Sequence, residues 1–284
     1  MSHSKLTPTE APSKIKFATF KVSMDATNYV GRNLALSTNQ VLISELKNNN
    51  QQIKNIAEII QRTRPDIILL NEFDYIADPK QGVELFISRY LNRSQHESVD
   101  AIDYPYYYYA PVNTGVSTPY DLTGDGKATG IQGDAWGFGY FEGQYGMVLL
   151  SKYPIDVSNI RTFKNFKWKD MPNALRPVVP STGKYFYNDE IWQQYPLSSK
   201  SHWDIPVLVD DKVIHVLASH PTPPVFDGPE DRNGCKNHDE VRFWHDYITP
   251  QLDGYIYDDN GTTGGLAKDT RFIIMGDQNS TSTE

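Results

Sequence analysis

The chain has 284 residues, a formal net charge of -8 and a sequence pI near 5.4, so its length suits one large α/β domain or two small ones. The acidic balance argues against tight, sequence-blind binding to long nucleic acid through a basic face, because that affinity comes largely from Lys and Arg neutralising phosphates. The single cysteine, Cys235, excludes an internal disulfide, and no apolar run is long enough to span a bilayer.

The first residues differ in composition from the rest of the chain. Residues 1–14 are rich in Ser, Thr, Pro and Lys and lack the apolar core of a secretion signal. We expect a disordered lead-in there, which could be what remains after a signal was removed or replaced. The domain itself is expected to run from residue 15 to residue 284.

The first predicted unit is a strand, a helix and a second strand. Residues 16–22 alternate polar and apolar side chains at period two, which predicts a strand. After a polar stretch, apolar residues recur at helical spacing from residue 53 and predict a helix that the Arg64–Pro65 pair ends. Residues 66–70 then predict a buried strand, with polar side chains following directly at its C-terminal end.

The middle of the chain alternates short elements with long irregular segments. Residues 82–91 suggest a short helix, and residues 104–109, with five tyrosines, suggest a strand with one aromatic face buried. Residues 113–143 are rich in Gly, Asp and Thr and predict a long surface excursion. Residues 146–151 predict another buried strand, whereas residues 164–200 are irregular and aromatic.

The last third predicts a hairpin, a helix and a strand. Strands around residues 204–209 and 213–219 are close enough in sequence to form a hairpin. Asn237, with Glu240 three residues later, resembles a capping box that opens a helix. Residues 271–275 then predict a final strand of the kind that is covered on both faces.

Polar side chains follow four of the predicted strands. Gly276 allows a sharp turn after the last strand, and Asp277 and Asn279 come directly after it. Taken alone, this segment is ordinary turn chemistry. The other strand ends present comparable polar side chains: Lys21, Asn71, Glu72 and His220. Groups held at the mouths of rigid strands are what metal or phosphate chemistry requires.

The order and local sequence of these strand ends resemble the endonuclease/exonuclease/phosphatase superfamily of metal-dependent phosphoesterases. The similar segments are Arg64–Phe73, Tyr145–Pro154, Ser219–His220 and Gly276–Asn279, and the resemblance extends from Ile15 to the end of the chain. A longer stretch, Ser219–Pro224 with Asp227–Gly234, resembles a branch of the family that is often secreted. That branch implies an extracellular or periplasmic location.

The resemblance implies a fold and a reaction. The implied fold is an α/β four-layer sandwich of two mixed β-sheets packed face to face, with helices outside. The implied activity is divalent-metal-dependent hydrolysis of phosphoesters by in-line attack of an activated water, with Mg²⁺ or Mn²⁺ as the cation. The substrate could be nucleic acid, a lipid or a small phosphodiester, and no obligate protein partner is evident.

The resemblance also implies roles for individual residues. Glu72 would bind the metal, and Asp277 would activate or orient the water. Asn279 would position the water or the phosphate, while His220 would donate to the phosphate in the transition state. Tyr145 could reach the phosphate. The substrate-binding candidates beside these residues are Lys21, Asn71 and His202.

The sequence departs from the family pattern in two places. Lys21 stands where the family usually has Asn, and its ammonium could occupy the electrostatic position of the metal or contact phosphate itself. The remaining catalytic groups of the family, an Asp and a Ser-Asp-His ending, would follow Gly276–Asn279, and the chain stops at Glu284. We therefore expect a domain that is incomplete at its C-terminus, with a bare strand edge prone to association. A catalytically inactive domain acting in binding is the alternative.

Two weaker patterns concern other ligands. Asp121, Thr123 and Asp125 supply oxygen groups at calcium-loop spacing, with Gly126 at the sixth position but Gln132 in place of the final Glu. A possible Ca²⁺ site competes there with a plain Asp/Gly turn. His202, just before a predicted strand, could line the substrate cleft or could pack at a sheet edge.

Overall fold

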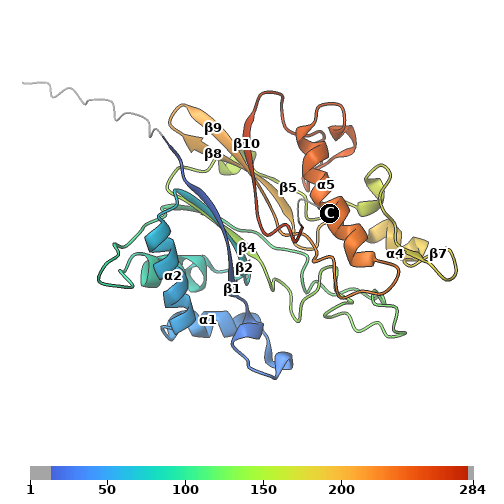
Figure 1. Ribbon diagram of the computed structural model, residues 1–284, viewed down its shortest axis with the longest axis horizontal. Helices are drawn as coiled ribbons and strands as arrows, with labels where there is room; N and C mark the ends of the chain where they lie inside the picture. The colour runs from blue at the N-terminus through green and yellow to red at the C-terminus, as the bar shows by residue number, and fades with distance from the viewer. Residues whose placement is uncertain (1–13, 281–284) are drawn as a thin grey trace, which may run out of the picture.

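The computed structural model describes residues 14–280, which form two β-sheets packed face to face with helices on the outer side of each (Figure 1). Nearly all of the predicted lead-in, residues 1–13, lies outside the described residues, as do residues 281–284. Within the described part of the chain, no helix is both long and apolar enough to cross a membrane.

The first sheet is mixed and has the strand order β1-β2-β4-β3. It contains β1 (Phe17–Met24), β2 (Ile67–Phe73), β4 (Met147–Ser151) and β3 (Tyr106–Tyr108). β1 and β2 are parallel, with Lys21 opposite Asn71, whereas β4 is antiparallel to both of its neighbours. The carboxyl ends of β1 and β2 and the amino end of β4 therefore lie at the same edge of the sheet.

The second sheet is also mixed, with the order β10-β9-β8-β5. It contains β10 (Arg271–Met275), β9 (Lys212–Ser219), β8 (His202–Val209) and β5 (Arg161–Thr162). β8 and β9 form the predicted hairpin, and β10 runs parallel to β9. A separate two-stranded ribbon consists of β6 (Val178–Val179) and β7 (Lys184–Tyr185).

The helices fall into two groups, one for each sheet (Figure 1). The α-helices are α1 (Asn39–Lys47), α2 (Gln51–Thr63), α3 (Val83–Phe86), α4 (Asp189–Gln194) and α5 (Arg232–Ile248). A π-helical turn, η4 (Ile87–Leu91), continues α3. Short 3₁₀ turns are η1 (Ala26–Asn28), η2 (Leu34–Leu36), η3 (Pro79–Gln81), η5 (Val157–Asn159), η6 (Trp168–Asp170) and η7 (Asp253–Tyr255).

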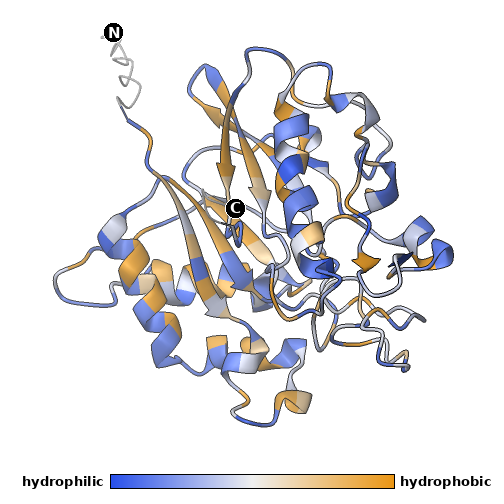
Figure 2. Cartoon of the chain, turned by 45° about the vertical axis from the view of Figure 1, so that its right-hand side comes forward, coloured by the Kyte–Doolittle hydropathy of each residue, from blue (hydrophilic) through white to orange (hydrophobic). Residues whose placement is uncertain are grey.

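The alternation of side chains along the strands explains the layered architecture. In β2, Ile67 and Leu69 face the core between the sheets, whereas Ile68 and Leu70 belong to the core beneath α1, α2 and α3. β8 contributes Trp203, Ile205 and Val207 to the inter-sheet core, and a third core of aromatic side chains lies under α5. Figure 2 shows the apolar strands enclosed between more polar outer helices. The predicted four-layer α/β sandwich is confirmed.

α2 forms where the sequence predicted it. Its first turn is capped by the Asn50 side chain, which accepts hydrogen bonds from the backbone N–H groups of Gln52 and Ile53. Its last turn ends at Arg64, which has a left-handed φ of 49° directly before Pro65. α1, by contrast, occupies part of the stretch that the sequence analysis treated as merely polar.

Two predicted features are wrong in detail. α5 begins at Arg232, so Asn237 and Glu240 lie inside the helix and do not cap it. β10 is an edge strand, and its Phe272 and Ile274 side chains are 43% and 41% exposed, so it is not covered on both faces. An apolar run does not reveal where its strand lies in the sheet, because burial depends on neighbours distant in sequence.

Candidate active site

Six strand ends meet at one edge of the two sheets. The carboxyl ends of the parallel pairs β1/β2 and β9/β10 bring together the predicted residues that lie at or just after them. The amino ends of β4 and β8 reach the same edge, because these strands run antiparallel to β2 and β9. Tyr145 and Lys200, which precede β4 and β8, thus join residues from the other four strands.

The ammonium of Lys21 lies between two carboxylates. Lys21 Nζ is 3.0 Å from Glu72 Oε1 and 3.7 Å from Asp277 Oδ2. Burial alone would lower the pKa of Lys21, but the hydrogen bond to Glu72 and the charges of Glu72 and Asp277 outweigh it and raise that pKa. Lys21 is therefore a cation held at the site, although its side chain is still 52% exposed.

Backbone strain accompanies these residues. Ser23, Glu72, Tyr145 and Asn279 all have left-handed φ values, between 49° and 61°, which non-glycine residues seldom adopt. The Ser23 hydroxyl donates to Glu72 Oε2 at 3.2 Å, so both oxygens of that carboxylate are engaged. Such outliers persist where the surrounding structure holds them, and they cluster at functional sites.

His220 faces Asp277 from the end of β9. His220 Nε2 lies 3.8 Å from Asp277 Oδ2, and the ring is almost completely buried. Burial, reinforced by the charges of Lys200 and Lys21, holds the pKa of His220 well below its usual range. The imidazole is therefore neutral at pH 7, a state in which one nitrogen can donate and the other can accept.

The turn after β10 is fixed by close backbone packing. Gly276 has a φ of 144°, and a Cβ added there would lie 1.8 Å from the carbonyl oxygen of Ser219. Asn279 N donates to Asp277 Oδ1 at 3.2 Å, and Asn279 Nδ2 donates to the carbonyl of Pro221 at 3.0 Å. From α5, Asn237 Nδ2 donates to the carbonyl of Gln278 at 3.1 Å.

Glu240 connects α5 to the same edge. Its two carboxylate oxygens accept hydrogen bonds from Ser199 N at 2.6 Å and from Thr222 N at 2.7 Å. One buried acid on the helix thus fixes the segment before β8 and the segment after β9. These hydrogen bonds explain why Asn237 and Glu240 are polar although they lie on the buried face of the helix.

A cleft of about 690 Å³ opens at this edge. It contains five of the residues predicted for catalysis, metal binding or substrate binding, together with an aromatic wall that the sequence does not predict. The predicted residues along it are Lys21, Glu72, Tyr145, His220 and, at the turn after β10, Asn279, and the aromatic wall includes Trp136, Tyr187 and Tyr195. Asp277 contacts two residues that line the cleft, Lys21 and His220.

Two further lysines that were not among the predicted site residues line the cleft. Lys200 is 6% exposed and Lys236 is 3% exposed. Burial lowers the pKa of Lys200 to about 8, although the charges of Glu240, Glu72 and Asp277 oppose that shift. A signal for Lys200 existed in the sequence: it precedes a strand predicted to pair antiparallel with the strand that ends at His220.

Two predicted substrate-binding residues lie outside the cleft. Asn71 is fully buried, and its Oδ1 accepts from the Thr19 hydroxyl at 3.1 Å. His202 is buried against Phe243, with its ring nitrogens bonded to the Ser198 hydroxyl and the Glu240 carbonyl. Neither side chain lines the cleft, so their positions do not support the predicted contact with substrate.

Tyr145 does line the cleft, but its hydroxyl has a neighbour within the protein. Tyr145 Oη lies 3.5 Å from the hydroxyl of Thr27. Burial raises the pKa of Tyr145 to about 12, so the phenol stays protonated near neutral pH. The side chain could therefore serve as a hydrogen-bond donor, not as a base.

The carboxylates of the possible calcium loop accept hydrogen bonds from residues of the same loop. Asp121 accepts hydrogen bonds from the Thr123 hydroxyl and from the backbone N–H groups of Gly124 and Gly126, while Asp125 accepts from Lys127 N. These bonds form an Asp/Gly turn, the alternative that the sequence left open. No group of three or more His, Cys, Asp or Glu side chains suited to a metal ion occurs in residues 14–280.

The donor set at the strand ends does not fit a divalent cation as it is arranged. Glu72 and Asp277 are oxygen ligands of the kind that Mg²⁺ prefers. The Lys21 ammonium, however, already lies in the space between these carboxylates, and Ser23 engages the second oxygen of Glu72. A cation could be held there only after Lys21 has moved away.

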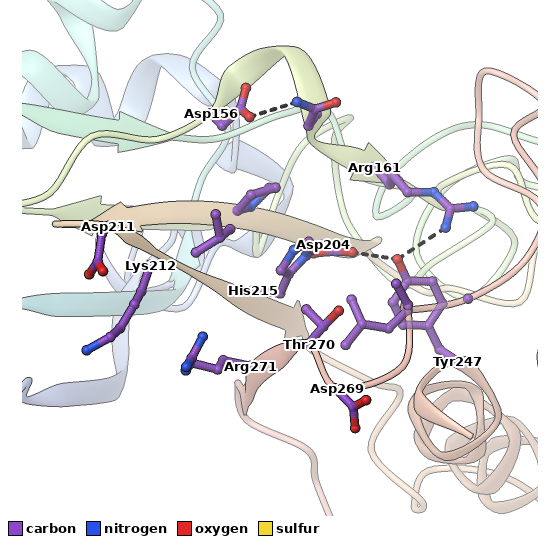
Figure 3. Close-up of a pocket in the computed structure, with 16 residues that line it drawn as sticks. Asp156, Arg161, Asp204, Asp211, Lys212, His215, Tyr247, Asp269, Thr270 and Arg271 are labelled. Atoms are coloured by element: carbon purple, nitrogen blue, oxygen red, sulfur yellow. Dashed lines mark hydrogen bonds and ion pairs between the residues drawn. The ribbon is translucent and has the colours of Figure 1, made fainter. Parts of the chain in front are cut away.

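A second cavity, of about 600 Å³, lies at the opposite end of β8 and β9 (Figure 3). There Asp204 Oδ1 lies 2.6 Å from His215 Nδ1, and Asp204 Oδ2 accepts from the Tyr247 hydroxyl at 2.5 Å. Arg161 Nη1 donates to the same hydroxyl at 3.2 Å. These contacts tie β5, β8, β9 and α5 together, and none of the predicted site residues lies here.

Comparison with known proteins places the chain in a family. Residues 30–284 match the model of the Endonuclease/Exonuclease/phosphatase family. No curated protein sequence gives a significant match. One similar solved structure is an endonuclease/exonuclease/phosphatase from Beutenbergia cavernae DSM 12333, at 13% identity and a TM-score of 0.40, over 83% of this chain and 44% of that chain.

Two other solved structures resemble the chain at comparable levels. A mutant of beta toxin from Staphylococcus aureus with bound magnesium ions has 13% identity and a TM-score of 0.44, over 96% of this chain and 67% of that chain. TDP2 from Caenorhabditis elegans has 12% identity and a TM-score of 0.31, over 74% of this chain and 38% of that chain. The chain spans less than half the length of two of these three proteins. From the match over residues 30–284, the chain belongs to the Endonuclease/Exonuclease/phosphatase family.

Proposed function

We propose that this chain hydrolyses phosphoester bonds by in-line attack of an activated water in the cleft at the strand ends. The observation that carries the proposal is the meeting of Glu72, His220 and Asp277 with Lys21 at one edge of two sheets. A carboxylate, a neutral imidazole and an ammonium within one cleft can orient a water and stabilise charge on the non-bridging oxygens.

Each side chain has a chemically suitable role in this proposal. The Asp277 carboxylate would accept a hydrogen bond from the attacking water and orient it. His220, neutral because its pKa is low, would donate a hydrogen bond to a phosphate oxygen. Asn279, held by its bond to the Pro221 carbonyl, would keep the Asp277 turn in place. Tyr145, which also lines the cleft, would donate a hydrogen bond from its hydroxyl.

The place of Mg²⁺ or Mn²⁺ in this proposal depends on Lys21. Glu72 and Asp277 would be the ligands, but their present arrangement favours the ammonium. We therefore assign no step to a metal, and we infer that cation dependence is weaker here than in a site with a neutral side chain at position 21.

A second candidate function is binding without catalysis. The Lys21–Glu72 ion pair favours it, because a carboxylate neutralised by an internal ammonium is a poorer ligand for a catalytic cation. In that case the cleft would bind an anionic ligand without hydrolysing it.

The test is hydrolysis of bis-p-nitrophenyl phosphate and plasmid DNA with Mg²⁺, Mn²⁺, Ca²⁺ or EDTA. We expect activity in the unmodified chain, and losses of at least about a hundredfold in Glu72→Ala and in His220→Ala. Glu97→Ala, which removes an exposed carboxylate far from the cleft, is the matched control and should retain activity. Hydrolysis that survives both substitutions would exclude this site. No hydrolysis under any condition would favour the binding function.

A further inference from the structure

Lys200 and Lys236 are two buried charges that the proposed hydrolysis does not use. Lys200 precedes β8, and its backbone carbonyl accepts a hydrogen bond from Asn113 N at 2.9 Å. Lys236 lies on the buried face of α5, where its Nζ donates to the Trp136 carbonyl at 3.2 Å. Both side chains are more than nine-tenths buried and both line the cleft.

Neither ammonium is neutralised by direct contact with a carboxylate. Within residues 14–280, Lys200 Nζ has no hydrogen bond and no ion pair, and Lys236 Nζ has no ion pair. Glu240 is the acid whose charge acts most strongly on Lys200, but its two oxygens already accept from the backbone of Ser199 and Thr222. A buried charge without a direct partner is destabilising, so its presence calls for an explanation.

The charges along the cleft favour an anion. Of the described residues that line it, four carry a positive charge and one is a carboxylate, in a chain with a net charge of -8. Lys21 is engaged by Glu72 and Asp277, and Arg232 is paired with Glu230. The charges that remain for a ligand are those of Lys200 and Lys236.

The surroundings of Lys236 also suit a ligand with a flat apolar part. Its Nζ lies 4.2 Å from the centre of the Tyr195 ring, which packs against Trp136 with ring centres 5.3 Å apart. Trp136 is only partly buried and forms part of the cleft wall. The ammonium of Lys236 and the rings of Tyr195 and Trp136 therefore lie next to each other in the cleft.

We propose that Lys200 and Lys236 form an anion-binding subsite, and that the substrate is a small phosphoester carrying a second anionic group. The scissile phosphate would lie beside Lys21 and His220, and the second group would lie beside the two buried ammonium groups. This inference rests on the proposed function, because it names the substrate class of the same cleft.

The experiment compares two probes that differ by one phosphate, thymidine 5′-phosphate and thymidine 3′,5′-bisphosphate. Their binding is measured by isothermal titration calorimetry in EDTA, which needs neither turnover nor metal. We expect the bisphosphate to bind about tenfold or more tightly than the monophosphate. Lys200→Met and Lys236→Met should each remove most of that preference, and Lys200→Arg and Lys236→Arg should keep it.

The control is Lys80→Met, which removes an exposed ammonium outside the cleft and should leave the preference unchanged. Thermal unfolding of each variant shows whether it is folded. Equal affinity for the two probes, or an unchanged preference in either folded Met variant, would overturn the subsite.

The outcome is separable from that of the proposed function. If the bisphosphate preference depends on Lys200 and Lys236 but nothing is hydrolysed, the subsite stands and the hydrolase proposal fails. If bis-p-nitrophenyl phosphate is hydrolysed but the preference does not depend on these lysines, the subsite alone fails.

Discussion

Lys21 decides the electrostatics of the carboxylate pair at the strand ends. Its ammonium is 3.0 Å from Glu72 and 3.7 Å from Asp277, where a second cation would meet like charge. Two unit charges about 4 Å apart near a protein surface repel by roughly 4 kcal/mol. Because Lys21 is half-exposed, it can withdraw toward solvent, so the net penalty on cation binding is smaller than that figure.

Replacing Lys21 should therefore create cation affinity. We expect Lys21→Asn to bind Mn²⁺ about tenfold or more tightly than the unmodified chain, since it removes the charge and adds a ligand oxygen. Lys21→Met, which removes the charge alone, should be intermediate. Titration of the free Mn²⁺ signal by electron paramagnetic resonance measures this, with Lys80→Asn as control. Equal affinity in all variants would show that Lys21 does not compete with a cation.

Lys200 makes stability depend on pH. Burial lowers its pKa to about 8 in the folded chain, against an ordinary value of 10.5 when unfolded. Between these two values the unfolded chain binds more protons, so the contribution of Lys200 makes the free energy of unfolding rise with pH. Below pH 8 the buried charge is destabilising by about 3 kcal/mol.

Lys200→Met should consequently be more stable than the unmodified chain at pH 7, with the difference shrinking as pH rises through 8 toward 10.5. Urea unfolding at pH 7 and at pH 10 measures both points. A Lys200→Met variant that is less stable at pH 7 would contradict this prediction. It would show that the attraction between Lys200 and Glu240 contributes more to stability than burial of the ammonium costs.

At the scale of elements, the turn after β10 is fixed by how closely it approaches β9. Gly276 has a positive φ, and any Cβ would collide with the Ser219 carbonyl, which is backbone and cannot rotate away. Asp277 and Asn279 follow directly, so a shift of this turn would move Asp277 away from His220 and Lys21.

We expect Gly276→Ala to lower the free energy of unfolding by about 2–3 kcal/mol. We also expect it to reduce hydrolysis, as Glu72→Ala is expected to do. Gly254→Ala is the matched control, because a Cβ there meets nothing within 4 Å, and its effect should stay within about 0.5 kcal/mol. Urea unfolding measures the first effect. A Gly276→Ala variant as stable as the control would mean that β9 and β10 separate easily.

At the scale of the whole molecule, the second sheet has an accessible edge. Among the described residues, β10 pairs only with β9, and its Phe272 and Ile274 side chains are exposed. An edge strand with unpaired backbone groups and apolar side chains is a template for pairing with another chain.

We expect the chain to self-associate at high protein concentration, and Ile274→Lys to restore the monomer. Val157→Lys adds the same charge at an exposed valine of η5, away from that edge, and should leave association unchanged. Size-exclusion chromatography with light scattering gives the molar mass. A monodisperse monomer in the unmodified chain would contradict the prediction.

Much of the architecture follows from local sequence. The period-two pattern of residues 16–22, the apolar run before Asn71 and the hairpin before His220 all correspond to observed strands. α2 and its end at Arg64 follow from helical spacing and from the restriction that Pro65 imposes. These features were predictable because each depends on residues within a few positions of one another.

The site was predictable only in part. Glu72, His220 and Asp277 lie at or just after the carboxyl ends of predicted strands, so their grouping could be anticipated from the polar residues at those strand ends. Lys200 carries a signal in the sequence, because it precedes a strand of the predicted hairpin that ends near His220. Lys236 carries none, because the predicted helix begins after it, whereas α5 begins at Arg232. His202 was assigned to the cleft because the sequence does not reveal which way a side chain at a strand end turns.

The sequence by itself determined the longer strands, the helix α2 and the polar groups at the strand ends, since periodicity and turn residues act locally. The short strands β5, β6 and β7 lie in segments without a clear pattern. The tertiary structure alone decided that Lys21 lies between two carboxylates, that two lysines are buried in the cleft, and that β10 is exposed. The physical reason is that charge proximity and burial depend on segments far apart in the chain, which only packing brings together.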